Sequence, residues 1–281
     1  MPHMTHMLVA SDLTSKSIYP LERAMQLREQ SGALVTVLHV VEPGFTSYLE
    51  ERRRLDALTV LQEWRGALPE AERQGVTVAV MVGDPFATII EEAASRQMDL
   101  VVVGRPSKSG LRDLFLGTTA ERVVRFGDHP VLMANRPANG GYKRVLVAMD
   151  LSQAGRRALE WACHIAPDAE VRIVHAWQSP LIDFSRNDDA GLATANERLR
   201  HQEEQQLKAL VAQMGLPGKP PRIEIIERSP QTAIRIGMGA FDAQLLAMGT
   251  HSRSRRRTLM VGSLAQEFLA EGGCDVLVTR A

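Results

Sequence analysis

The chain has 281 residues, a length that favours about two domains of ordinary size. Its 33 basic and 33 acidic residues give a formal net charge of zero, which argues against a protein that binds nucleic acid through bulk electrostatics. No apolar run approaches the roughly 20 residues of a membrane helix, and the first ten residues lack the basic start of a secretory signal. The two cysteines form neither a disulfide framework nor a zinc motif. We therefore expect a cytoplasmic protein without nucleic-acid or membrane partners.

Short apolar strands alternate with amphipathic helices along the first half of the chain. Strands are expected at residues 7–10, 33–41, 76–82, 100–104 and 130–134. Helices are expected from Ser15 to Ser31, from Ser47 to about Gln74 with an interruption at Pro69, from Pro85 onward, and from Gly117 to Phe126. This alternation predicts an α/β fold, with a parallel sheet covered by helices on both faces.

The segment Pro137–Gly141 has the composition of a linker, and the same order of elements begins again after it. Strands are expected at 143–149, 170–177, 222–227, 245–249 and 275–279, and helices at 152–163, 188–214, 230–240 and from Gly262. Residues 83–133 align with 228–278 without a gap, and residues 8–12 align with 146–150. The sequence therefore predicts a tandem duplication of one α/β unit, with domains at residues 1–137 and 143–281.

Each half contains a strand that ends at a glycine, a basic loop with serines, and a Gly-Ser or Gly-Thr pair that opens a helix. The candidate binding residues are Gly104, Ser107, Gly117 and Thr118 in the first half and Gly249, His251, Ser252, Gly262 and Ser263 in the second. Backbone N–H groups in such a loop, together with the helix dipole, favour a phosphate. The hydroxyls of Thr118 and Ser263 can cap their helices or contact the anion, and the glycines can serve packing alone.

Asp12 and Asp150 end the first strand of their halves. In an open parallel sheet the ligand lies beyond the carboxyl ends of the strands, where the strand order reverses. Each aspartate would then face the same crevice as its glycine loop, although an aspartate after a strand also caps the next helix. His39 and His175 occupy matched strand ends, where a structural role is the simpler interpretation. The sequence contains no P-loop lysine motif, no GxSxG and no HExxH.

On these residues, each half resembles a universal stress protein domain, and the whole chain resembles a tandem member of that family. The family's nucleotide motif is Gly, two residues, Gly, nine residues, Gly, then Ser or Thr. Its outer elements match Gly104 with Gly117-Thr118, and Gly249 with Gly262-Ser263, while serine replaces the second glycine in both halves. The resemblance implies two doubly wound, five-stranded parallel-sheet domains of the adenine nucleotide alpha hydrolase-like type.

The resemblance also implies a stress-response protein that binds ATP, ADP or AMP, with Mg²⁺, in one or both domains. It would act as a regulatory binding module rather than as an enzyme, with Asp12 and Asp150 near the adenosine. The last strands of the two halves would pair into an intramolecular pseudo-dimer, and the whole chain would dimerise further. Two alternatives stay open. One is an enzyme, either a slow ATPase or a transferase, and the other is a pseudo-dimer with degenerate sites that acts through protein partners, which Ser107 and Ser252 favour.

The two loops differ in the donors they offer to a phosphate. In the first, Pro106 removes one backbone N–H, and we count only Lys108 as nearby charge. The second loop has no proline and carries Arg253 and the run 255–257 of arginines. Because charge-assisted contacts to phosphate are strong, the sequence favours the second half as the tighter phosphate site.

Overall fold

The computed structural model describes residues 4–44, 46–105, 118–179, 189–216, 218–250 and 263–280. The first half contains β1 (His6–Ala10), η1 (Ser15–Ser17), α1 (Ile18–Ser31), β2 (Leu34–Val41), α2 (Ser47–Ala67), α3 (Glu70–Arg73), β3 (Val76–Val82), α4 (Pro85–Ser95), β4 (Leu100–Gly104), α6 (Thr119–Phe126) and β5 (Val131–Ala134). The second half contains β6 (Arg144–Ala148), α7 (Gln153–Ile165), β7 (Glu170–Ala176), α8 (Asp189–Gln213), β8 (Arg222–Ile226), α9 (Pro230–Phe241), β9 (Leu245–Thr250), α10 (Ser263–Glu271) and β10 (Asp275–Arg280).

Proline and capping residues set several helix boundaries where the sequence placed them. The long helix after β2 stops at Ala67, because Leu68 precedes Pro69 and is extended, and α3 begins one residue after the proline. Pro85 occupies the first turn of α4, and the Asp84 side chain accepts from the N–H of Ala87 at 3.3 Å. The helix expected to end at Cys163 continues to Ile165, whose side chain is buried in the core.

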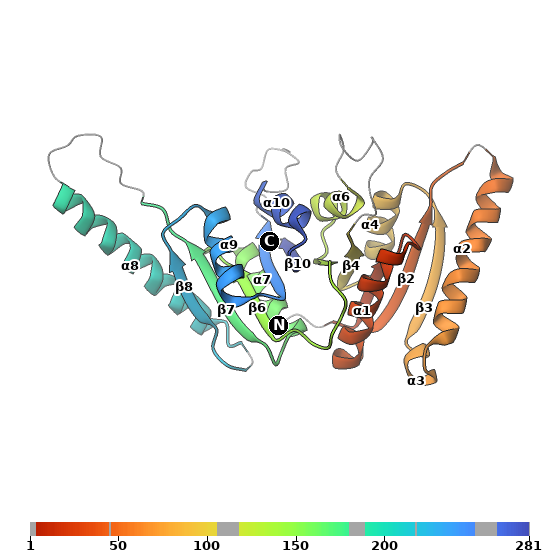
Figure 1. The fold of residues 1–281 in the computed structure, drawn as a ribbon, viewed down its shortest axis with the longest axis horizontal. Coiled ribbons are helices and arrows are strands. Elements are labelled where there is room, and N and C mark those ends of the chain that lie inside the picture. Colours follow the sequence, from red (N-terminus) through yellow and green to blue (C-terminus); the bar gives the residue numbers. More distant parts are fainter. Residues whose placement is uncertain are drawn as a thin grey trace.

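The ten strands found in the described residues form one sheet, in the order β3-β2-β1-β4-β5-β10-β9-β6-β7-β8. Within each half every neighbouring pair is parallel, so the doubly wound five-stranded unit expected from the sequence is confirmed twice. The halves join where β5 and β10 pair antiparallel, with Leu132 opposite Leu277. The predicted pairing of the last strands is therefore confirmed, and the sheet is continuous across the junction (Figure 1).

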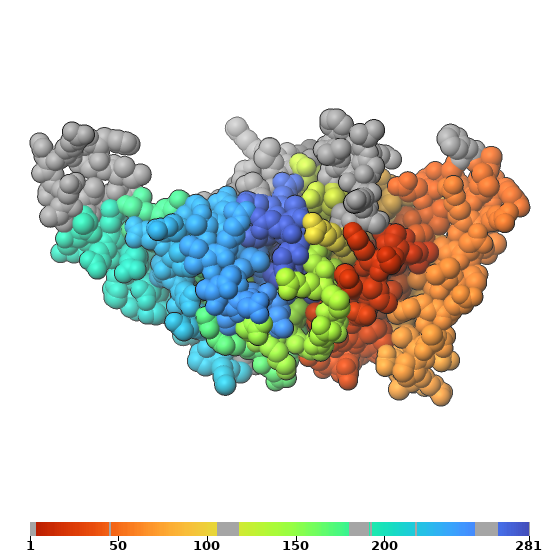
Figure 2. All heavy atoms as spheres, viewed as in Figure 1, coloured from red at the N-terminus to blue at the C-terminus, as the bar shows by residue number. Residues whose placement is uncertain are grey.

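Helices cover both faces of this sheet. One face carries α1, α2, α7 and α8, whose buried side chains share one apolar core that extends through both halves. The other face carries α4, α6, α9 and α10 over a second core. In the space-filling view, the blue atoms of the last elements lie against the yellow-green atoms of the first half (Figure 2). The two halves thus share their cores as well as their sheet.

A buried ion pair crosses the junction between the halves. The Nε of Arg23 in α1 donates to an oxygen of Asp275, the first residue of β10, at 3.1 Å, and the two side chains are 6% and 1% exposed. The hydroxyl of Tyr142 donates to the same oxygen at 2.6 Å, and the backbone N–H of Asn135 donates to the other at 2.8 Å. Burial and the Asp275 carboxylate together raise the pKa of Tyr142 well above its usual value. This cluster ties the last strand of the second half to the first helix of the first half.

Candidate functional site

Each half has a pocket beyond the carboxyl ends of its strands. The first pocket has a volume of about 380 Å³ and is lined by Ala10, Ser11, Asp12, Ser17, Leu38, His39, Val40, Glu42, Pro85, Ile89, Val103, Gly104, Arg105, Thr119 and Ala120. The second pocket, of about 280 Å³, is lined by Ala148, Met149, Asp150, Val174, His175, Ala176, Pro230, Ile234, Met248, Gly249, Thr250, Leu264 and Ala265. Most members of one set have their sequence equivalent in the other, so the two pockets are duplicated along with the fold.

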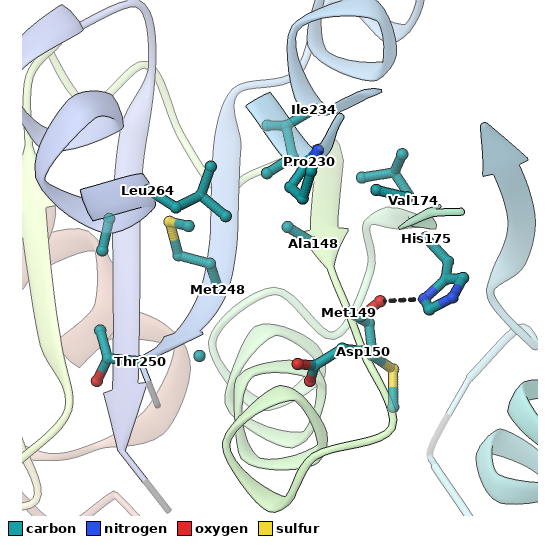
Figure 3. A pocket seen from close by; sticks show the side chains of 13 residues that line it. Ala148, Met149, Asp150, Val174, His175, Pro230, Ile234, Met248, Thr250 and Leu264 are labelled. Carbon is teal, nitrogen blue, oxygen red and sulfur yellow. Dashed lines mark hydrogen bonds between the residues drawn. The ribbon is translucent and has the colours of Figure 1, made fainter. Parts of the chain in front are cut away.

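The strand order explains why the pockets form here. In the first half, β1 lies between β2 and β4, and the chain crosses to opposite faces of the sheet on either side of it. The same arrangement places β6 between β7 and β9. A crevice opens where successive connections diverge in this way. In Figure 3, Met248, Ile234 and Leu264 reach the second pocket from β9, α9 and α10.

Asp12 and Asp150 line their pockets as the sequence predicted, and both carboxylates also organise the turn that follows the strand. Asp12 accepts from the N–H of Thr14 at 3.0 Å and from the hydroxyl of Ser17. Asp150 accepts from the N–H of Ser152 at 3.1 Å and from its hydroxyl. The Ser152 oxygen in turn caps α7, so Asp150 supports the helix start through a second residue. Contact with a ligand remains a prediction.

The two matched histidines make the same hydrogen bond. Nδ1 of His39 lies 2.8 Å from the carbonyl oxygen of Ser11, and Nδ1 of His175 lies 2.8 Å from that of Met149 (Figure 3). Each histidine thereby fixes the residue just before the pocket aspartate. Nε2 of His175 also lies 3.3 Å from a carboxylate oxygen of Glu203 in α8. Both rings therefore act as structural supports of the pocket wall, in agreement with the interpretation of the sequence.

Gly104 and Gly249 also line the pockets, and close helix packing explains the glycines. A Cβ on Gly249 would lie 2.5 Å from the carbonyl carbon of Ala154 at the start of α7. A Cβ on Gly104 would lie 3.2 Å from a ring carbon of Pro20 in α1. The first helix of each half therefore packs against this strand end, which gives the motif's first glycine a packing role independent of any ligand.

Thr118 is the N-cap of α6 and takes part in a capping box. Its side-chain oxygen accepts from the N–H of Glu121 at 3.2 Å, and the Glu121 carboxylate accepts from the N–H of Thr118 at 3.0 Å. Of the two roles expected for this hydroxyl, the structure thus contains the capping role. Ser263 begins α10, although its side chain lies outside the described part of the chain.

Five of the candidate residues, Ser107, Gly117, His251, Ser252 and Gly262, lie outside the described residues, as do the arginines of the second loop. Their roles, and the preference for the second half that rested on those arginines, remain predictions.

One lining residue was overlooked in the sequence. Arg105 directly follows β4 and lines the first pocket, whereas the sequence analysis counts only Lys108 as nearby charge. Its position next to the motif glycine was the available signal.

The described residues hold no group of three or more His, Cys, Asp or Glu side chains arranged to bind a metal ion. Over the same residues, no helix is long and apolar enough to cross a membrane.

Polar and charged atoms are unevenly distributed between the pockets. The first is lined by Asp12, Glu42 and Arg105 as well as by hydroxyls, whereas the second combines one aspartate and one histidine with mainly apolar side chains.

Comparisons with known proteins agree with the duplicated architecture. The model of the universal stress protein family matches residues 4–135 and again residues 141–280. A universal stress protein of Mycolicibacterium smegmatis is 24% identical over 296 aligned residues, which cover 97% of this chain and 96% of the relative. One from Mycobacterium bovis is 29% identical over 215 residues, 73% of this chain and 65% of the relative. The crystal structure of a universal stress protein from Archaeoglobus fulgidus has a TM-score of 0.70 at 22% identity, covering 98% of this chain and 96% of its own.

Proposed function

Because the chain belongs to the universal stress protein family, we propose that it is a stress-response protein that binds an adenine nucleotide in one or both of its pockets. It acts as a regulatory binding module, with ATP, ADP or AMP as the ligand and Mg²⁺ as a companion of the phosphates. The observation that carries this proposal is the pair of equivalent pockets at the strand-order reversal of each half.

The pocket walls fit the parts of a nucleotide. Apolar side chains such as Val40 and Ile89 in the first pocket, or Ala176 and Ile234 in the second, offer the surface that an adenine ring requires. Asp12 and Asp150 supply carboxylate oxygens that can accept from ribose hydroxyls. In the first pocket the two acidic residues come from the β1 and β2 ends, and Arg105 comes from the β4 end. This separation of charge favours a ligand whose phosphates lie toward β4.

A binding role is favoured over rapid catalysis by the chemistry of the lining residues. Asp12 and Asp150 accept hydrogen bonds from the turns that follow their strands, and Arg105 donates to a backbone carbonyl, so these charged groups are engaged in holding the fold. Slow ATP hydrolysis needs little more than positioning of phosphate, metal and water, and it stays as the second candidate.

The test is nucleotide titration of the whole chain with and without Mg²⁺, together with a phosphate-release assay. Ligand at about 100 times its Kd stabilises the native state by about 2.7 kcal/mol, so the melting temperature should rise. Val40→Trp fills the first pocket and Ala176→Trp the second, and each should remove binding from one half. Val82→Trp, on the exposed part of β3, is the matched control.

Absence of binding by any adenine nucleotide would overturn the proposal and favour degenerate sites. Turnover at about 1–1,000 per second, the range typical of enzymes, would instead favour the enzymatic alternative.

A further inference from the structure

Arg105 links the first pocket to the opposite half of the chain. It follows β4 immediately and lines the first pocket. Its Nη2 donates to the carbonyl oxygen of Ala270, in the last turn of α10, at 3.0 Å. The sequence separation of these residues is 165, and they belong to different halves. A cation on the last carbonyls of a helix is favourable because it meets the negative end of the helix dipole.

The backbone after α10 is shaped to receive this guanidinium. Gly272 has a φ of +65°, and a Cβ at this position would collide with the Arg105 guanidinium. The left-handed backbone favours glycine here, and a methyl group at this position would displace the Arg105 guanidinium. Two residues of the second half therefore contact the Arg105 guanidinium: Ala270 through its carbonyl oxygen, and Gly272 through the backbone that packs beside it.

The second pocket has no such residue at the equivalent position. The ungapped alignment of the halves pairs Arg105 with Thr250, a buried residue whose hydroxyl donates to the carbonyl of Thr279 at 3.3 Å. The equivalent of Ala270 is Arg125, and its carbonyl accepts from Arg280 at the end of β10. Arg280 therefore makes the corresponding link to a helix end, but it is not among the residues that line either pocket. Of these two arginines, Arg105 alone combines the cross-half bond with a place in the wall of the first or second pocket.

We propose that Arg105 contacts a phosphate of the ligand in the first pocket and that the second half of the chain positions it there. This inference rests on the proposed nucleotide binding and adds to it a residue that distinguishes a nucleotide from its nucleoside. A guanidinium presents several N–H donors in a planar fork, so one carbonyl and one phosphate can be bound together. The first pocket is then incomplete without the second half, because α10 and Gly272 hold its cation.

The experiment compares ATP with adenosine by calorimetric titration of the full chain, in a background where Ala176→Trp fills the second pocket. Arg105→Thr introduces the residue that the second half has at this position. Arg280→Thr is the matched control, since it removes the corresponding cross-half arginine outside the pockets. We expect Arg105→Thr to weaken ATP about 10- to 100-fold and adenosine by less than about 2-fold. Arg105→Lys should bind ATP more tightly than Arg105→Thr does. Arg280→Thr should leave the ratio of the ATP affinity to the adenosine affinity unchanged.

Positioning by the second half has its own pair of variants. Gly272→Ala places a methyl group against the guanidinium, whereas Gly140→Ala strains a left-handed backbone of φ +78° with no neighbour within 4 Å. Of these two variants, only Gly272→Ala should lower the affinity for ATP relative to the affinity for adenosine. The affinity for adenosine reports whether the first pocket is still folded in each variant.

Three results would overturn the inference. Equal ATP affinity in wild type and Arg105→Thr would exclude the phosphate contact. Equal losses of ATP and adenosine affinity in Arg105→Thr and Arg280→Thr would reduce both arginines to structural links. If the chain binds adenosine and ATP equally from the start, Arg105 selects nothing, whereas failure to bind either ligand would be a failure of the proposed function itself.

Discussion

Replacing Asp275 by alanine is expected to cause a large loss of stability, because its carboxylate is the acceptor of a buried cluster. Arg23 and Tyr142 both donate to it, and the Asp275 side chain is 1% exposed. Removing one partner of a buried ion pair leaves an uncompensated charge and costs about 3–5 kcal/mol. With about 2–4 °C per kcal/mol for chains of 150–250 residues, the melting temperature should fall by about 6–20 °C.

The assay is urea and thermal unfolding followed by circular dichroism and tryptophan fluorescence. Glu51→Ala removes the partner of Arg54 in an exposed pair on α2, and it should leave the midpoint unchanged. The double variant Arg23→Met with Asp275→Leu should recover part of the loss, because apolar side chains replace both buried charges. A loss below about 1 kcal/mol for Asp275→Ala would refute the reasoning, since that is the magnitude of a solvated pair.

Further predictions concern packing, thiol reactivity and alkaline stability. Gly249→Ala should destabilise the chain through its 2.5 Å approach to Ala154, whereas Gly66→Ala, with no neighbour within 4 Å, should not; equal melting temperatures would contradict the packing argument. Burial raises the pKa of Cys163 to about 11 and that of Cys274 to about 12, so a thiol reagent at pH 8 should modify them only on unfolding; rapid modification of native protein would contradict this. Because the pKa of Tyr142 is raised by folding, the unfolded chain loses this proton first above pH ~10. Stability should therefore fall with rising pH there, and an equal fall in Tyr142→Phe would contradict the assignment.

The fold was largely predictable from the sequence because its signals are local and occur twice. Buried parallel strands produce short apolar runs in the sequence. Pro69 and Pro85 mark helix boundaries because the proline ring fixes φ and removes the backbone N–H in every environment. The pairing of the last strands was also predictable, since short apolar edge strands favour association. In the observed antiparallel register, Leu132 lies opposite Leu277.

The site was only partly predictable. Asp12 and Asp150 were found because they end strands, a position that topology turns into a pocket wall. Arg105 was missed although it directly follows the motif glycine, and its bond to the Ala270 carbonyl was not predictable, because a bond from a side chain to a backbone atom in the other half leaves no pattern in the sequence. The cluster around Asp275 was missed for a related reason, since Arg23 lies 252 residues away in the sequence.

The junction between β5 and β10 has a consequence for how the halves can diverge. In a symmetric dimer of separate chains the interface is isologous, so a residue placed at one end of the seam appears at the other end as well. Here the position equivalent to Asp275 is Pro130, and the ion pair with Arg23 occurs at one end of the seam. Because β5 and β10 belong to one chain, the two ends of their junction need not carry the same residues. A single substitution therefore changes only one end of the junction in each molecule, and one half of the chain can change while the other half stays the same.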